Sequence, residues 1–249
     1  MIIIKNNQEI DRMRSAGKIV AETLLLVEEK VRPGITTAEL DRIAEEFITK
    51  HGAKPSFKGL YGFPASLCIS VNEQVVHGIP GGYVLKDGDI ISVDCGANIN
   101  GFHGDAARTF GVGNISEEAE KLINVTKESF FRGIEYAKVG NRLTDISHEI
   151  QSYVEASGFS VVRDFVGHGI GRVVHEDPDI PNYGRPGRGP KLVEGMALAI
   201  EPMVNVGNYK VKTLKDDWTV VTSDGSLSAH YENTIVILPD GPEILTLIK

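Results

Sequence analysis

Apolar residues recur every three or four positions in four segments of the chain, and this spacing predicts four amphipathic helices. The helices are expected at about 7–29, 36–52, 116–136 and 144–158. Thr36, Ser116 and Thr144 are the expected N-caps, because a hydroxyl oxygen can accept a hydrogen bond from a backbone N–H of the first turn. Thr36 and Glu39 have the spacing of a capping box.

Short runs rich in valine and isoleucine predict strands between and after these helices. In the first half of the chain the strands are expected near 66–76, 90–95 and 107–112. In the second half they are expected near 159–166, 196–204, 218–222 and 234–238. The proline- and glycine-rich stretch 177–191 is expected to be a loop.

The second half of the chain repeats the first at an offset of 107 residues. A leucine, a glycine and an acid recur with the same internal spacing, and two helical positions recur at the same offset. The pairs are Leu85/Leu192, Gly88/Gly195, Asp94/Glu201, Thr37/Thr144 and Ile43/Ile150. An offset that is kept from a helix into a strand predicts two similar halves, at about 1–113 and 114–249, within one domain 1–249.

Two acids are expected to lie side by side in the first half. Asp94 ends an apolar strand, and Asn100-Gly101 is a typical type I′ hairpin sequence. The hairpin would bring Asp105 back beside Asp94. Two buried carboxylates repel each other, and a divalent cation would remove that conflict. A turn cap and a solvated carboxylate explain these two residues alone equally well.

The second half supplies similar residues. Glu201 follows an apolar strand and Glu232 precedes one; each alone is typical of a surface charge at a strand end. Four acids beside buried strands indicate a metal site instead. The segment 168–178 has the pattern HGxGxxxHExP, which contains His168 and His175, and His77 follows another apolar run.

Composition narrows the class of protein. The chain has 249 residues, 41% hydrophobic and 24% charged, with a formal net charge of −8. The negative charge argues against broad nucleic-acid binding. Cys68 and Cys95 are too few for a disulfide framework. Residues 1–5 are too short and polar for a secretory signal, and no run of eighteen apolar residues occurs, so a cytoplasmic protein without a membrane span is expected.

Five segments together resemble the type I methionine aminopeptidases, members of the pita-bread metallopeptidases. They are SVDCGA at 92, GDAART at 104, VGHGIGRVVHEDP at 166, AIEPM at 199 and SLSAHYENT at 226. The resemblance covers nearly the whole chain. It implies an α+β pita-bread fold, in which a curved, mostly antiparallel sheet carries helices on its outer face and two pseudo-symmetric halves form a single catalytic domain.

The resemblance also implies the metal ligands and the activity. The ligands would be Asp94, Asp105, His168, Glu201 and Glu232, holding two divalent ions of cobalt, manganese or iron, with zinc possible. Asp105 and Glu232 would bridge the ions. The enzyme would remove the initiator methionine of nascent proteins and peptides when the next residue is small. A hydroxide activated by the two metals would attack the first peptide bond.

The same resemblance assigns roles to residues around the metals. His77, His175 and Glu201 would be catalytic. The methionine side chain would enter a pocket whose family positions are Phe57, Leu60, Phe63, Cys68, Val174 and Trp218. Phe57 and Leu60 depart from the cysteine and tyrosine often found there.

Two rival functions share parts of this pattern. Proline-specific aminopeptidases and prolidases share the ligands but usually carry a large N-terminal domain, for which the residues before Asp94 leave no room. A non-catalytic pita-bread binding protein would have lost ligands, whereas all five are present. A monomer is expected, with a transient ribosome contact through Lys210, Lys212 and Lys215 as a hypothesis; a solvated loop explains these lysines as well.

Overall fold

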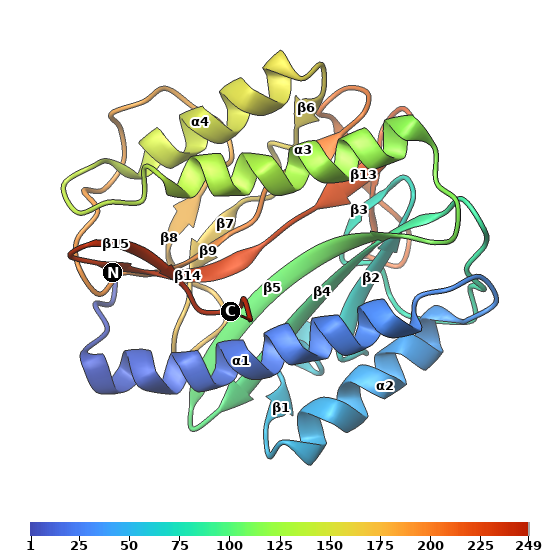
Figure 1. The fold of residues 1–249 in the computed structure, drawn as a ribbon, viewed down its shortest axis with the longest axis horizontal. Helices are drawn as coiled ribbons and strands as arrows, with labels where there is room; N and C mark the ends of the chain where they lie inside the picture. Colours follow the sequence, from blue (N-terminus) through green and yellow to red (C-terminus); the bar gives the residue numbers. More distant parts are fainter. Residues whose placement is uncertain (249) are drawn as a thin grey trace.

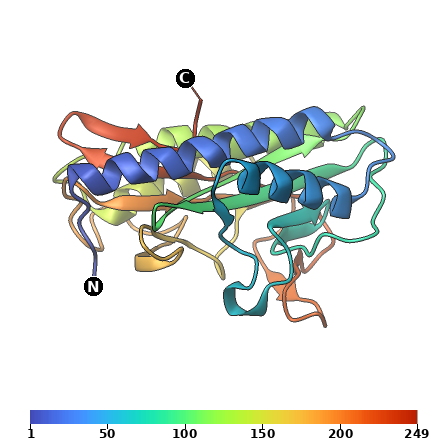
Figure 2. The same cartoon turned by 90° about the horizontal axis from the view of Figure 1, so that it is seen from below.

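The computed structural model describes residues 1–248, in which helices cover one face of a curved layer of strands (Figure 1). Figure 2 shows that the loops on the opposite face project away from the helices. Every pair of named strands in this part of the chain is antiparallel. Between residues 1 and 248, no helix has the length and apolar character needed to cross a bilayer.

All four predicted helices form, as α1 (Asn7–Lys30), α2 (Thr37–Lys50), α3 (Glu117–Ile134) and α4 (Leu143–Ala156). Thr36 and Ser116 cap α2 and α3 as predicted.

The predicted cap of the last helix is wrong. The helix α4 begins one residue before Thr144, and the Asp145 carboxylate accepts the N–H of the capping residue Arg142 at 2.8 Å. The Thr144 hydroxyl instead exchanges hydrogen bonds with the backbone of Arg188, and so ties down the loop before β9.

The strands are more numerous than predicted; the two that form the longest hairpin are longer than predicted, and several others are shorter. Those of the first half are β1 (Lys54–Pro55), β2 (Leu67–Val71), β3 (Gln74–Val76), β4 (Ile90–Ile99) and β5 (Phe102–Gly111). A short 3-10 helix, η1 (Leu60–Gly62), lies between β1 and β2. Those of the second half are β6 (Ser160–Val161), β7 (Gly167–Gly169), β8 (Glu176–Ile180), β9 (Ala197–Ile200), β10 (Met203–Asn205), β11 (Val211–Thr213), β12 (Val220–Thr222), β13 (Ser228–His230), β14 (Asn233–Leu238) and β15 (Gly241–Ile244).

Two predicted strands are interrupted, and a third is shortened. Asn72 turns the chain with φ 53°, which separates β2 from β3. Pro202 has no N–H to donate to a neighbouring strand, and it lies between β9 and β10. The segment expected at 159–166 contains only β6, while the expected loop 177–191 begins within β8, which pairs with β7. Lys212 likewise lies in a strand, β11, rather than in a loop.

The longest hairpin confirms the predicted turn. β4 and β5 meet at Asn100 and Gly101, whose φ values are 55° and 77°. In the register of this pair, Gly96 lies opposite Asp105 and Asp94 opposite Ala107. Asp94 and Asp105 are therefore diagonal neighbours on one face of the hairpin.

The two halves repeat the same local structure. Leu85 exchanges two backbone hydrogen bonds with the loop before α2, and Leu192 exchanges two with the loop before α4. Gly88 and Gly195, three residues later, both have positive φ, at 94° and 81°. Each half then enters a buried strand, β4 or β9, that leads to an acid. The pseudo-symmetry predicted from the 107-residue offset thus extends to matching hydrogen bonds.

Each half also has its own apolar core beneath its helices. Val20, Leu24 and Leu40 pack against β4 in the first, whereas Leu122 and Ile146 pack against β9 and β14 in the second. The helix α1 lies close to β5, since a Cβ on Gly104 would be only 2.8 Å from the backbone nitrogen of Gly17. The helices therefore hold the hairpin that carries two of the acids.

Replacing Gly104 with alanine should push α1 away from β5, because the added methyl meets backbone rather than a flexible side chain. We expect a loss of about 1–3 kcal/mol in the free energy of unfolding, as is usual for overpacking. Urea unfolding measures it. The matched control is Gly82→Ala, whose added carbon would meet nothing within 4 Å. Equal stability of the two variants would contradict this close packing.

Candidate metal centre

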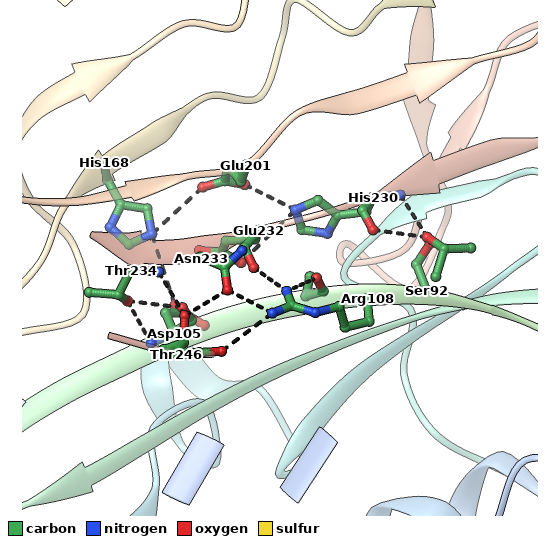
Figure 3. A network of polar contacts seen from close by, with 12 residues as sticks. Ser92, Asp105, Arg108, His168, Glu201, His230, Glu232, Asn233, Thr234 and Thr246 are labelled. Atoms are coloured by element: carbon green, nitrogen blue, oxygen red, sulfur yellow. Dashed lines mark hydrogen bonds and ion pairs between the residues drawn. The ribbon is translucent and has the colours of Figure 1, made fainter. Parts of the chain in front are cut away.

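The five predicted ligands converge from separate strands on the middle of the curved layer. Asp94 lies in β4 and Asp105 in β5, His168 lies in β7, Glu201 follows β9 and Glu232 precedes β14. Figure 3 shows four of them around one space, with Asp105 below and Glu201 above. Ligand atoms of Asp105, His168 and Glu232 lie within 4.8 Å of one another, close enough to hold one metal ion.

The imidazole of His168 presents its free nitrogen to this space. Its Nε2 lies 3.7 Å from Glu201 Oε1 and 4.0 Å from Asp105 Oδ2. Its Nδ1 lies 2.8 Å from the carbonyl oxygen of Gly169, which can only accept, so Nδ1 donates. That bond fixes the tautomer and leaves the Nε2 lone pair available for a metal. Burial lowers the pKa of His168 to about 4, which keeps the ring neutral.

The carboxyl groups of Asp105 and Glu232 are buried, those of Asp94 and Glu201 are nearly so, and the four repel one another when ionised. Burial raises the pKa of Asp94 to about 7. Burial, together with the charges of neighbouring acids, raises the pKa of Asp105, Glu201 and Glu232 well above the ordinary range. The ionised forms are therefore disfavoured unless a positive charge lies among them.

Several of the buried atoms have no hydrogen-bond partner among residues 1–248. They include one carboxylate oxygen from each of three acids, Asp94 Oδ1, Asp105 Oδ1 and Glu232 Oε1. Buried polar atoms are normally paired, so three acceptors without donors in one place require an explanation. Divalent cations accept such oxygen ligands together with one imidazole. The residues present fit a divalent metal.

Backbone contacts around the site hold the acids in place. The Thr234 hydroxyl accepts the N–H of Asp105 and donates to its carbonyl oxygen, both at 2.9 Å. The guanidinium of Arg108 donates to the carbonyl of Glu232 and, at 2.6 Å, to Asn233 Oδ1. It also lies 4.3 Å above the Tyr231 ring. These bonds fix β5 against the start of β14 (Figure 3).

The two other predicted histidines lie at the same cavity. His77 follows β3 with φ 60°, and its ring meets the edge of Phe165 at 5.5 Å. The His175 ring lies 4.5 Å from that of His168 and stacks on Tyr61 at 6.0 Å. Burial lowers the pKa of His77 to about 4 and lowers that of His175, so both rings are neutral donors near pH 7.

All six predicted pocket residues belong to one apolar cluster beside the acids. The Phe63 ring meets the edge of Trp218 at 5.1 Å, and Cys68 is buried beneath them. The cavity has a volume of about 530 Å³ and also reaches His77 and the acids. The cluster consists of Phe57, Leu60, Phe63, Cys68, Val174 and Trp218, with Ala65 and Ile79.

Comparison with known proteins agrees with this geometry. Residues 11–239 match the sequence profile of metallopeptidase family M24. The chain belongs to this family. A methionine aminopeptidase of Clostridium perfringens is 80% identical over 249 residues, with both chains fully covered. The structure of a methionine aminopeptidase from Thermotoga maritima superposes with a TM-score of 0.98 at 50% identity, again covering both chains fully.

More distant members of the structural group share the fold alone. The prolidase of Pyrococcus furiosus has a TM-score of 0.80 at 24% identity, and the match covers 99% of this chain and 66% of that one. Together with the M24 match, these likenesses confirm the predicted pita-bread fold. The additional third of the prolidase lies outside the match.

His230, which the sequence motifs did not identify as a site residue, also lies beside the acids. Its Nε2 lies 3.6 Å from Glu201 Oε2 and 4.0 Å from Glu232 Oε2, and it has no hydrogen-bond partner of its own. The signal was available in the sequence, since His230 stands two residues before Glu232 and alternate residues of an extended segment share a face. Burial lowers the pKa of His230 to about 3, so the ring is neutral.

Metal binding should release protons from this site. The buried acids retain protons near neutral pH, with the pKa of Asp94 at about 7, and a metal displaces them. Mn²⁺ is therefore expected to bind more weakly at pH 6 than at pH 8. Calorimetric titration of metal-free protein in two buffers of different ionisation enthalpy counts the protons. Binding at pH 6 without proton release would contradict the raised pKa values.

The stability of the metal-free protein should also depend on Asp94. A raised pKa means that the folded state holds this proton more tightly than the unfolded state. The stability that this tighter proton binding adds to the folded state is complete below the ordinary pKa of about 3.9. It is lost as the pH rises to about 7. The free energy of unfolding should therefore fall more from pH 4 to 7 in wild type than in Asp94→Asn. Urea unfolding of both proteins at each pH measures this difference. An equal pH dependence of the free energy of unfolding in the two proteins would contradict the raised pKa of Asp94.

Proposed function

We propose that this chain is a methionine aminopeptidase that removes the N-terminal methionine of nascent proteins and peptides when the second residue is small. The observation that carries the proposal is the juxtaposition of an acid cluster with an apolar pocket in one cavity. The free amine and the scissile carbonyl of a substrate would lie at the acid cluster, while its thioether side chain would enter the apolar pocket.

Divalent ions held by Asp94, Asp105, His168, Glu201 and Glu232 would supply a Lewis acid and a nucleophilic water at neutral pH. The oxygen-rich donor set suits manganese, iron or cobalt, and two ions are proposed because the five candidate ligands include four carboxyl groups.

The residues of the chain would orient the substrate and move its protons. His175 is a neutral donor at the cavity and would hydrogen-bond the oxygen on which negative charge develops. His77, across the cavity, would contact the nitrogen side of the peptide bond. Glu201 would take the proton of the attacking water and pass it to the departing amine, because its carboxylate lies at the cavity beside the other acids.

The apolar cluster supports selection of methionine. The Phe63 and Trp218 rings form walls, and the Cys68 thiol stays protonated because burial raises its pKa. Aromatic rings and a thiol are favourable neighbours for a thioether.

Peptide cleavage tests the function directly. Protein loaded with Mn²⁺ should release methionine from Met-Ala-Ser, but act poorly on Met-Trp-Ser, Leu-Ala-Ser and Ala-Pro-Ser. Asp94→Asn should lower kcat/KM at least about 10³-fold, since it removes a ligand. The matched control is Asp11→Asn, an exposed carboxylate on α1, which should be unchanged. Preference for Ala-Pro-Ser would favour the proline-specific function, and absence of cleavage with any metal would favour a binding protein.

We further propose a cytoplasmic monomer that meets its substrates at the ribosome. Lys210, Lys212 and Lys215 are exposed on and around β11 and would attract ribosomal RNA. Co-sedimentation with ribosomes should weaken with added salt and in the triple Lys→Ala variant. Binding that ignores both changes would refute a contact through these lysines.

A further inference from the structure

A buried ion pair lies directly behind the cavity. Lys5 Nζ is 2.5 Å from Glu176 Oε2, and the two side chains are only 2% and 3% exposed. Taking both charges out of water costs free energy that their attraction only partly offsets, so such a pair is weak evidence for a role in stability. Glu176 is the residue after His175, and it lines the cavity. The placement therefore indicates a role in the site.

Glu176 closes the loop that carries His175. While Oε2 faces Lys5, its Oε1 accepts the N–H of Arg172 at 2.8 Å, so the carboxylate ties the two ends of the loop together. Just before the loop, the carbonyl of Gly171 accepts the N–H of His103 at 2.8 Å. The position of the His175 backbone thus depends on where the Glu176 carboxylate is held.

Lys5 is itself anchored. Its Nζ donates to the carbonyl of Ile3 at 2.9 Å, and its N–H donates to the carbonyl of Gly195 at 2.8 Å. The segment before α1 is therefore attached to the second half of the protein, 171 residues away in sequence from Glu176.

Two glycines make room for this lysine. A Cβ on Gly171 would lie 2.4 Å from Lys5 Cε and 2.6 Å from Glu176 Oε1. A Cβ on Gly195 would lie 2.6 Å from the carbonyl oxygen of Lys5. The close approach is possible only because both positions lack side chains.

We propose that the Lys5–Glu176 pair positions the His175 imidazole, so that the segment before α1 belongs to the catalytic apparatus although it touches no substrate. The proposal rests on the proposed function, in which His175 donates to the reacting carbonyl. Lys5 holds Glu176, Glu176 holds both ends of the loop, and the loop presents the ring between His168 and Tyr61.

Substitution of Lys5 tests the proposal, because a positioning role predicts a lower kcat with little change in KM. Lys5→Met keeps the length of the side chain and removes its charge. Misplacement of a reacting group by about 1 Å lowers rates about 10²-fold, so we expect kcat for Met-Ala-Ser to fall by that order with KM little changed. Lys18→Met is the control, the same change at an exposed lysine of α1. A folded Lys5→Met variant with wild-type kcat would overturn the proposal.

A double-mutant cycle shows whether Lys5 acts through His175. In a His175→Ala background, Lys5→Met should lower kcat no further, because residues that act as a unit are not additive. An additional loss equal to that seen in wild type would overturn the proposal. Glu176→Gln, which keeps an acceptor for the Arg172 N–H and removes the charge, should reproduce the kinetics of Lys5→Met and serves if that variant does not fold.

Hydrogen–deuterium exchange gives a readout that does not depend on activity. In Lys5→Met, amides of residues 171–176 should exchange faster, while those of α3 and α4 stay unchanged. Faster exchange throughout the protein would mean that the pair only stabilises the fold, and would overturn the positioning role. If wild type showed no aminopeptidase activity while the exchange difference appeared, the proposed function would fail and the attachment of the loop would stand.

Discussion

Mutual repulsion among four carboxyl groups shielded from water is the constraint around which this protein is arranged. Burial raises the pKa values of Asp94, Asp105, Glu201 and Glu232, and neighbouring charge adds to this for the last three. Separating these groups or keeping them protonated would relieve the repulsion. Separation is prevented, because each acid is fixed in or next to a strand whose other residues are packed in an apolar core. The stable core therefore holds the acids in an unfavourable arrangement.

The protein does not neutralise this charge with its own cations. Within residues 1–248, the ion pairs of these four acids involve only His168 and His230, and burial keeps both rings neutral. Arg108 is close to Glu232 but donates to backbone carbonyls and to Asn233. An arginine that stabilises the backbone leaves the carboxylate oxygens available. The ionised carboxylates thus lack a counter-charge from the described part of the chain, and a divalent metal can supply it.

The sequence predicted what depends on local patterns and on motifs. The four helices, the turn at Asn100-Gly101 and the offset between the halves follow from periodicity and turn chemistry. Strand bounds were less predictable, because single residues such as Asn72 and Pro202 interrupt apolar runs that read as continuous strands. The cap of α4 was missed for another reason: the Thr144 hydroxyl bonds Arg188, which lies 44 residues away, and no local pattern identifies that partner.

Within the site, residues carried by motifs could be foreseen, whereas contacts that join distant segments could not. His230 stands beside Glu232 in the chain, but its approach to Glu201 depends on how β13 and β10 pair. The attachment of Lys5 to Glu176 was equally hidden, because a lysine in a short N-terminal segment gives no sign of burial. Its environment is created by two glycines that come from distant parts of the second half.

The repeat explains why the site lies between the halves rather than inside one of them. Asp94 lies within β4 and Glu201 directly follows β9, at equivalent positions of the repeat, so each half brings an acid to the surface it shares with the other. This joint, the interface between the two halves, is closed by reciprocal backbone hydrogen bonds between Ala107 and Glu232. The Thr109 hydroxyl adds bonds to the N–H and carbonyl of His230. A metal bound here would contact residues of both halves, so binding and the stability of the joint are thermodynamically linked. The same acids that repel one another without a cation would then hold the two halves together.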